Sequence, residues 1–233
     1  MKDYIYLLNY YQPRNYFLRI FQFLFWFLSY LFSNEKKILF EKISIAIADS
    51  RAIMNLFSII ERLLNIFSQL LFFRKKNELQ KLLYLTYITS FCHISLHSYC
   101  FIMHLCKFNT DFEFFERIYN MFYTCTMLIN LIRYSIELKD LYNSRKEKEF
   151  SEEEKEKEKM GKIGIVIIAF NLPLALNGAE LIEKFFGFGL NEGIEGILGI
   201  VASIMQYYVA AFKCLKEIKS NYTDKKINNK KNM

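Results

Sequence analysis

The sequence predicts an all-α, membrane-associated helical bundle with amphipathic helices and a C-terminal Gly-rich helical hairpin that enters or spans the membrane. Three observations lead to this fold class. Polar residues recur at alternating spacings of four and three, which is the period of one face of an α-helix. Hydrophobic residues make up 53% and charged residues 24% of the chain, yet they fall in separate stretches. All eight glycines lie between residues 161 and 199.

Composition limits the partners that the chain can have. At 233 residues it can bury a substantial core. Its net charge of +7 is concentrated in residues 213–233, which carry seven lysines. A basic tail suits an anionic membrane surface or nucleic acid. The membrane is favoured because a long apolar segment precedes the tail, and no nucleic-acid partner is expected because the aromatic residues lie on apolar helix faces. Five cysteines without framework spacing predict free thiols.

The first predicted helix covers residues 14–32, and Pro13 can occupy its first turn. Its uncharged core, residues 20–32, is shorter than the roughly 20 residues that a membrane span needs. This helix is therefore expected either to lie on a membrane or to pack in a bundle. Its polar stripe consists of Asn15, Arg19, Gln22, Trp26, Ser29 and Ser33.

Residues 51–76 form the helix around which we expect the molecule to be organised, after a charged link and a short helical stretch in residues 34–50. A broad apolar side, a narrow polar stripe and a cationic end are typical of a helix lying in a membrane interface. The alternative is an ordinary bundle helix, whose apolar side would be core. The residues predicted to bind the membrane are Arg51, Phe57, Ile60, Arg62, Leu64, Phe67, Leu71, Arg74, Lys75 and Lys76, with the arginines at the lipid headgroups.

Residues 82–106 lack charged side chains and are long enough to span a membrane. They contain the only group of residues that resembles a catalytic or metal site, because imidazole and thiolate are ligands that suit zinc. No acid or base lies nearby in the sequence, so a polar stripe between packed helices is the favoured interpretation and no metal is predicted. The stripe consists of Thr86, Ser90, His93, His97, Cys100 and His104.

The predicted domain organisation has four parts. Residues 1–145 form an amphipathic helical region, which ends in a helix from about residue 111. Residues 146–162 form a charged linker or solvated helix extension. Residues 163–212 form the membrane hairpin, whose first half is interrupted by Asn171 and Pro173. Residues 213–233 form a basic cytosolic tail.

The hairpin is expected to pack through small side chains, which let helices approach closely in lipid. Lysines flank both of its outer ends, and the loop 187–195 has no Lys or Arg. By the positive-inside rule both outer ends face the cytosol and the loop faces the lumen. The predicted helix-packing residues are Gly193, Gly196, Gly199 and Ser203.

No catalytic arrangement is predicted, so the chain is not expected to be an enzyme or to hold a cofactor. The glycines at 187, 189 and 193 miss the dinucleotide-binding spacing by one residue and follow no predicted strand. Glu180, Glu183, Glu192 and Glu195 flank a loop and are interpreted as solvated.

Several segments, in order, resemble the peroxin-11 family (peroxisomal biogenesis factor 11). Residues 14–23 and 27–31 resemble the family's opening Arg-x-x-x-x-Arg-x-x-Gln-Tyr helix with its Leu-Ser-Tyr end. Ser50-Arg51, followed by Phe57 and Glu61, resembles the segment that begins the family's amphipathic helix. Residues 171–176 and 193–203 resemble its Asp-Leu-Pro-x-Ala and glycine-rich patterns, with Asn171 in place of the acid and Ala202 in place of the first Ser.

The resemblance implies a peroxisomal membrane protein with cytosolic termini. Such a protein inserts an amphipathic helix into the bilayer of anionic phospholipids and forms homo-oligomers. It elongates the membrane and promotes peroxisome proliferation and fission through membrane fission machinery, a dynamin-related protein and its adaptor. The alternative is a pore-forming channel for small metabolites, lined by the stripe from Thr86 to His104. A soluble helical scaffold is a third interpretation.

Overall fold

The computed structural model describes residues 11–70, 77–106, 111–144 and 151–231, and every regular element in these ranges is a helix. The elements are α2 (Tyr11–Leu31), α3 (Asn34–Leu70), α4 (Glu78–Leu105), α5 (Phe112–Ser144), α6 (Glu152–Gly178), the short α7 (Leu181–Phe186) and α8 (Glu192–Lys231). This confirms the all-α prediction.

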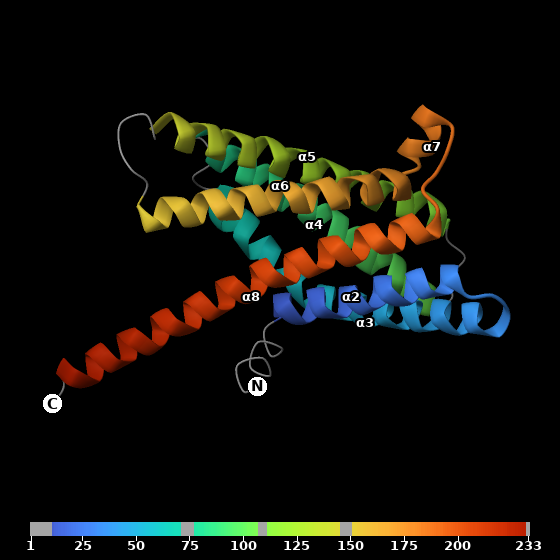
Figure 1. The fold of residues 1–233 in the computed structure, drawn as a ribbon, viewed down its shortest axis with the longest axis horizontal. Helices are drawn as coiled ribbons and strands as arrows, with labels where there is room; N and C mark the ends of the chain where they lie inside the picture. Colours follow the sequence, from blue (N-terminus) through green and yellow to red (C-terminus); the bar gives the residue numbers. More distant parts are fainter. Residues whose placement is uncertain (1–10, 71–76, 107–110, 145–150, 232–233) are drawn as a thin grey trace.

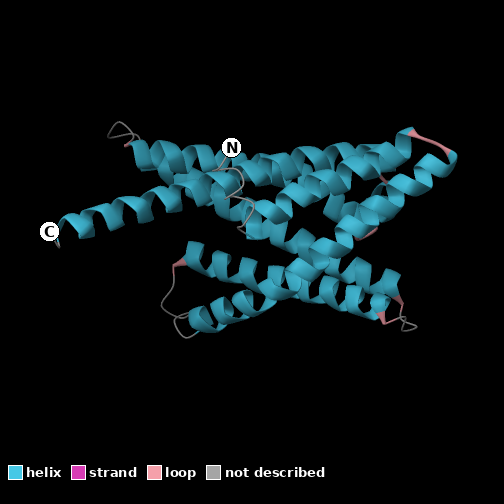
Figure 2. Cartoon of the chain, turned by 90° about the horizontal axis from the view of Figure 1, so that it is seen from below, coloured by secondary structure: helices cyan, strands magenta, loops and turns pink. Residues whose placement is uncertain are grey.

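The six long helices contact one another in a closed order. Along the chain, α2 packs against α3, α3 against α4, α4 against α5 and α5 against α6. The order closes because α8 packs against both α6 and α2 (Figure 1). In Figure 1, α8 runs between α6 and α2, and its C-terminal part continues beyond the other helices as a single helix, which Figure 2 shows from below. Each long helix therefore has one side facing an enclosed interior and another facing outward.

Local sequence signals account for several helix starts. Ser151 and Glu154 form a reciprocal capping box at the start of α6. The side chain of Asn77 accepts a hydrogen bond of 2.9 Å from the backbone N–H of Gln80 at the start of α4. Gly187 ends the short helix α7. Its φ is 75°, a left-handed conformation that favours glycine.

Two helices are longer than the sequence suggests. Residues 34–50, expected to be a link and a short separate helix, join the following segment in the single helix α3. The helix does not end at the polar residue Ser50, because its hydroxyl donates to the carbonyl of Ala46 and no Gly or Pro intervenes. Residues 152–162 of the charged segment likewise form the start of α6, which continues through Pro173 to Gly178.

The interior of the bundle contains many small and polar side chains beside large apolar ones. The largest fully buried side chains are Asn171, Pro13, Ser29, Ser98 and Ser203. Five of the buried apolar residues are alanines, whereas large apolar side chains are exposed on every long helix. A soluble protein places large apolar side chains inside. Here large apolar side chains such as Ile94, Phe101 and Ile168 are buried as well, but many others are exposed on the outside. Contiguous exposed apolar surface is typical of contact with a membrane or another protein.

Candidate membrane-facing surface

The outer face of α3 is an apolar stripe along the helix. At 3.6 residues per turn its exposed large apolar residues fall within about 120° of the helix circumference. From Ile53 to Leu70 this arc contains no charged residue, and Leu64 and Phe67 are 63% and 56% exposed. The exposed residues of the stripe are Ile38, Leu39, Ile45, Ile53, Leu63, Leu64 and Phe67.

The polar stripe of α3 lies on the opposite side of the helix and contacts its neighbours. The spacing alone predicts that Arg51 and Arg62 lie at lipid headgroups. In the structure both side chains instead donate hydrogen bonds to neighbouring helices. Arg51 donates from Nε to Asn15 Oδ1 at 3.0 Å and from its terminal nitrogen to Gln22. Arg62 donates to Ser90 Oγ at 2.6 Å. A guanidinium has five donors that need acceptors. The polar stripes of α2 and α4 supply some of them within the bundle, whereas Nε of Arg62 is buried and has no hydrogen-bond partner in the described parts of the chain.

The rest of the predicted membrane-binding set is less fully described. The side chains of Phe57 and Ile60 are not among those that the structure describes, although both residues lie within α3. Leu71, Arg74, Lys75 and Lys76 lie outside the described residues. The outer stripe therefore depends on Ile53, Leu63, Leu64 and Phe67 for its uncharged half.

A polar cluster at the centre joins four helices. Arg19 of α2 donates to Gln206 Oε1 of α8 at 2.8 Å and to Asn171 Oδ1 of α6 at 2.9 Å. Tyr123 of α5 donates to the same Asn171 oxygen at 3.0 Å, and the Asn171 amide donates to the carbonyl of Ile167. Asn171 has no exposed surface. Because every polar atom of this amide has a partner, its burial does not carry the cost of an unpaired polar group.

The histidine stripe of α4 packs against α5. His93 donates from Nδ1 to the carbonyl of Tyr119 at 2.9 Å, and its ring stacks on that of Tyr123 at 4.8 Å. The ring of His97 meets that of Tyr119 at 5.2 Å, and His104 meets Phe112 at 5.7 Å. Burial lowers the pKa of His93 to about 3 and that of His97 to about 4, so both imidazoles are neutral at pH 7. No three His, Cys, Asp or Glu residues among those described are placed to hold a metal ion.

The small residues of α8 are packed against α2. A Cβ added at Gly199 would lie 2.2 Å from the ring of Phe23, and one at Gly193 would lie 2.7 Å from the ring of Tyr30. At Gly196 it would meet the Phe27 backbone, 2.9 Å from Cα. Ser203 is fully buried and donates to the carbonyl of Gly199. The predicted hairpin partner, α6, also contacts α8, but the glycines of α8 lie against α2.

Two helices, Glu152–Gly178 and Glu192–Lys216, are long and apolar enough to cross a membrane. Length and composition alone do not distinguish a span from the core helix of a soluble protein. Here only 28% and 22% of the residues in their apolar stretches are buried within the bundle. Most residues of both stretches are therefore at least partly accessible from outside the bundle.

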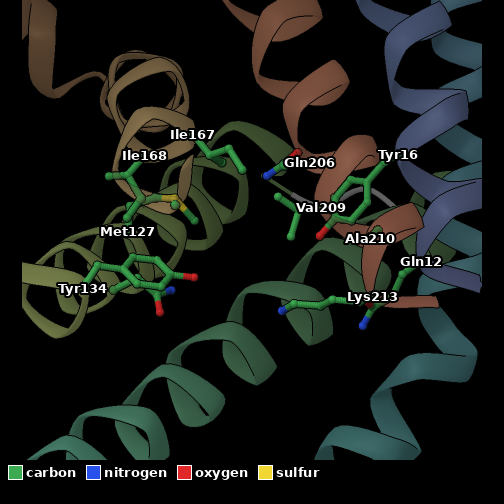
Figure 3. A pocket seen from close by; sticks show the side chains of 12 residues that line it. Gln12, Tyr16, Met127, Tyr134, Ile167, Ile168, Gln206, Val209, Ala210 and Lys213 are labelled. Carbon is green, nitrogen blue, oxygen red and sulfur yellow. The ribbon is translucent and has the colours of Figure 1, made fainter. Parts of the chain in front are cut away.

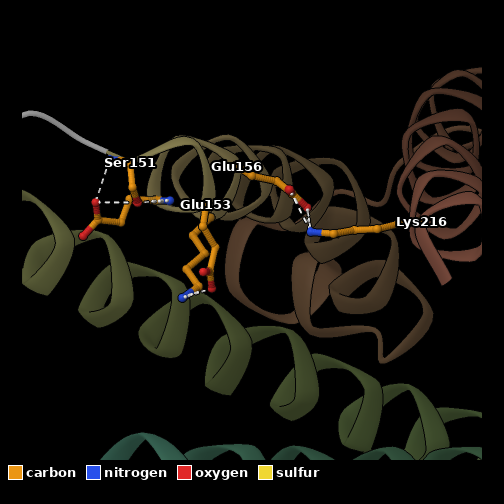
Figure 4. Close-up of polar contacts among 6 residues, drawn as sticks. Ser151, Glu153, Glu156 and Lys216 are labelled. Carbon is orange, nitrogen blue, oxygen red and sulfur yellow. Dashed lines mark hydrogen bonds and ion pairs between the residues drawn. The ribbon is translucent and has the colours of Figure 1, made fainter. Parts of the chain in front are cut away.

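The charged ends of these two helices lie beside each other. Lys216 of α8 pairs with Glu156 of α6 at 2.7 Å (Figure 4). Around this contact, Glu153 pairs with Lys157, and Glu158 pairs with Lys162. The outer ends of α6 and α8 are thus on the same side of the molecule, and the turn that contains α7 is at the far end (Figure 1). Phe185, Phe186 and Phe188 are exposed at that turn.

These features define a class of protein: an all-helical membrane-associated protein whose polar side chains meet between helices and which exposes many large apolar side chains on its outside. The family model for Peroxisomal biogenesis factor 11 (PEX11) matches residues 1–211. The chain belongs to this family, which acts in peroxisome biogenesis and associates with the peroxisomal membrane. This family is not a known enzyme family. No curated protein and no solved structure matches the chain significantly.

The segments that carry the family resemblance meet one another in the structure. Arg19 and Gln22 from the first segment hydrogen-bond to Asn171 and Arg51, which come from the third and the second. Gly196, from the glycine-rich segment, lies against Phe27 of the first. The resemblance is therefore concentrated in contacts between helices. Arg19, Asn171 and Gln206 were not predicted as site residues, although the polar stripe that contains Arg19 indicated a contact.

Proposed function

We propose that this protein remodels and elongates the peroxisomal membrane by inserting the outer apolar face of α3 into one leaflet. The observation that carries the proposal is the exposed apolar stripe of α3, on which Leu64 and Phe67 are exposed while the polar Asn171 and Ser203 are fully buried inside the bundle. Lipid is the partner that such an exterior fits best, because the cost of exposing large apolar side chains disappears in hydrocarbon.

The energetics favour insertion. Half-exposed side chains gain about half of the 1.5–3 kcal/mol that full burial of a large apolar side chain contributes. The seven exposed apolar residues of α3 together contribute on the order of 5–10 kcal/mol by the same reasoning, before the cost of immobilisation. A helix embedded about 5–10 Å deep adds area to one leaflet only. The bilayer therefore curves, with that leaflet on its convex side.

The polar interior has a specific part in this mechanism. Arg51 and Arg62 are held by Asn15, Gln22 and Ser90, so α3 is fixed to α2 and α4 along its polar side. The apolar side therefore enters lipid as part of a rigid bundle. In the proposed arrangement α6 and α8 span the membrane, and their lysine-flanked ends and both termini face the cytosol.

Family membership extends the proposal to partners. Anionic phospholipids would bind the basic side of the molecule, and self-association and membrane fission machinery would convert local bending into elongation and division. The channel remains the alternative. The polar stripe of α4 is engaged in helix contacts, since Ser90 accepts from Arg62 and His93 bonds to Tyr119, and these contacts favour packing over a water-filled path.

The experiment is to express the tagged full-length protein in cells and to score peroxisome number and length. We expect longer and more numerous peroxisomes, with the protein resisting extraction by alkaline carbonate. A protein that reaches peroxisomes and leaves their number and length unchanged would overturn the remodelling function. Anion or metabolite conductance in planar bilayers without any change in peroxisome shape would support the channel instead.

A further inference from the structure

A pocket of about 230 Å³ lies where α2, α5, α6 and α8 meet (Figure 3). It is close to the central polar cluster, because Gln206 belongs to both. Part of the lining is apolar and includes Met127, Ile168 and Val209. Another part is polar and includes Tyr134 and Lys213. The pocket has the mixed lining that is common in sites for small molecules with a polar group.

Three side chains present hydrogen-bond donors to this pocket. The orientation of the Gln206 amide is determined by Arg19, which can only donate and therefore requires Oε1 as its acceptor at 2.8 Å. The Gln206 amide nitrogen is left as a donor and has no partner within the described parts of the chain. The same holds for the ammonium of Lys213 and the hydroxyl of Tyr134. Figure 3 shows all three side chains around the same hollow.

Gly164 lets Tyr134 occupy this position. A Cβ at Gly164 would lie 2.6 Å from the Tyr134 ring, so the ring can lie against the backbone of α6 only because this residue is glycine. The guanidinium of Arg133 lies over the Tyr134 ring, 4.7 Å from the ring centroid. The hydroxyl is thereby held at the pocket by contacts on the ring.

The charge of the lining indicates the class of ligand. Lys213 is cationic and none of the lining residues is an acid. A cation with neighbouring neutral donors binds phosphate oxygens well. The pocket also lies at the lysine-flanked ends of α6 and α8, where the proposed arrangement puts the headgroups of the cytosolic leaflet. The apolar part of the lining suits the glycerol and upper acyl carbons that follow a headgroup phosphate.

We propose that this pocket binds the phosphate group of an anionic lipid through Lys213, Gln206 and Tyr134. The inference rests on the proposed membrane function and adds to it a defined headgroup site, distinct from the apolar face of α3. A lipid bound in this pocket would contact α2 and α5 as well as the two candidate spanning helices, and would hold the four together.

The test is a titration of the detergent-solubilised full-length protein, followed by native mass spectrometry. Three probes separate the possible sources of the ligand: dioctanoyl phosphatidic acid, dioctanoylglycerol without the phosphate, and inorganic phosphate. Lys213→Gln removes the pocket cation. Lys216→Gln is the matched control, because it removes the same charge one turn further along α8, from a lysine that pairs with Glu156 outside the pocket. Tyr134→Phe removes one donor and keeps the ring against Gly164.

We expect one phosphatidic acid to bind per chain, about tenfold more weakly in Lys213→Gln and about threefold more weakly in Tyr134→Phe. Lys216→Gln should bind as the wild type does. Binding of inorganic phosphate with the same dependence on Lys213 would support the phosphate site and identify free phosphate as a sufficient ligand. Equal weakening in the two lysine variants, or equal binding of dioctanoylglycerol, would overturn the site.

A separate measurement distinguishes failure of this site from failure of the membrane function. The Lys213→Gln protein should still embed in liposomes and deform them, because the apolar face of α3 is unchanged. If the wild-type protein embeds in liposomes but shows no phosphatidic acid binding, only the headgroup site is wrong. If it does not embed at all, the membrane function is wrong.

Discussion

Replacing Leu64 and Phe67 together by glutamate abolishes the tubulation of liposomes by the full-length protein, which stays embedded through α6 and α8. These side chains are 63% and 56% exposed on the outer stripe of α3, and neither has a polar partner. Each substitution removes part of the 1.5–3 kcal/mol of apolar burial and adds a carboxylate that lipid cannot solvate. Electron microscopy should show no tubules, whereas co-sedimentation with liposomes should stay as in the wild type because α6 and α8 are unchanged.

A matched control adds the same charge elsewhere. Asn143→Glu with Ser144→Glu places two carboxylates on exposed positions at the end of α5, away from the apolar stripe. This variant should bind and tubulate as the wild type does. If both double variants lose tubulation, net charge and not the α3 face controls it; if both still tubulate, the α3 face is not needed. Either result would refute the insertion mechanism.

Gly196→Leu separates α8 from α2. Even a Cβ at this position would lie 2.7 Å from the Phe27 Cβ and 2.9 Å from its Cα, and backbone cannot move aside as the end of a side chain can. Forced packing of this kind costs about 1–3 kcal/mol or more. Displacement of α8 would also break the Arg19 hydrogen bond to Gln206. We expect a markedly lower Tm in detergent and a helix pair that no longer protects its amides from hydrogen exchange.

Gly189→Ala is the control for this prediction. A Cβ at Gly189 meets only the Asn177 side-chain oxygen, at 3.4 Å, which is an ordinary contact. Its Tm should stay close to that of the wild type. A Gly196→Leu protein with an unchanged Tm would show that α2 and α8 do not approach as closely as the structure indicates.

Much of the fold follows from the sequence. The four-three spacing of Asn15, Arg19 and Gln22 predicts one polar face on α2, and the structure places all three residues in contacts with other helices. Helical periodicity identifies which residues share a face. It contains no information on which helix that face will meet, because the same stripe can face water, headgroups or another polar stripe.

This limit explains the main difference between prediction and structure. Arg51 and Arg62 are on the predicted polar face, but they bond to Gln22 and Ser90 and not to headgroups. A signal was present, since α2, α3 and α4 each carry a polar stripe and such stripes can satisfy one another. The contact of Gly196 with Phe27 could not be predicted in the same way, because small residues indicate a close approach without identifying its partner.

The central claim is that the apolar exterior faces lipid while the polar stripes meet inside the bundle. It is tested most directly by mapping the crosslinks that a photoactivatable phospholipid forms with the wild-type protein in liposomes. The account predicts crosslinks on exposed apolar residues such as Leu64, Phe67, Ile197 and Ile204, and none on the buried Asn171. Crosslinks at Arg51, Arg62 and Asn171 with none at Leu64 and Phe67 would contradict it.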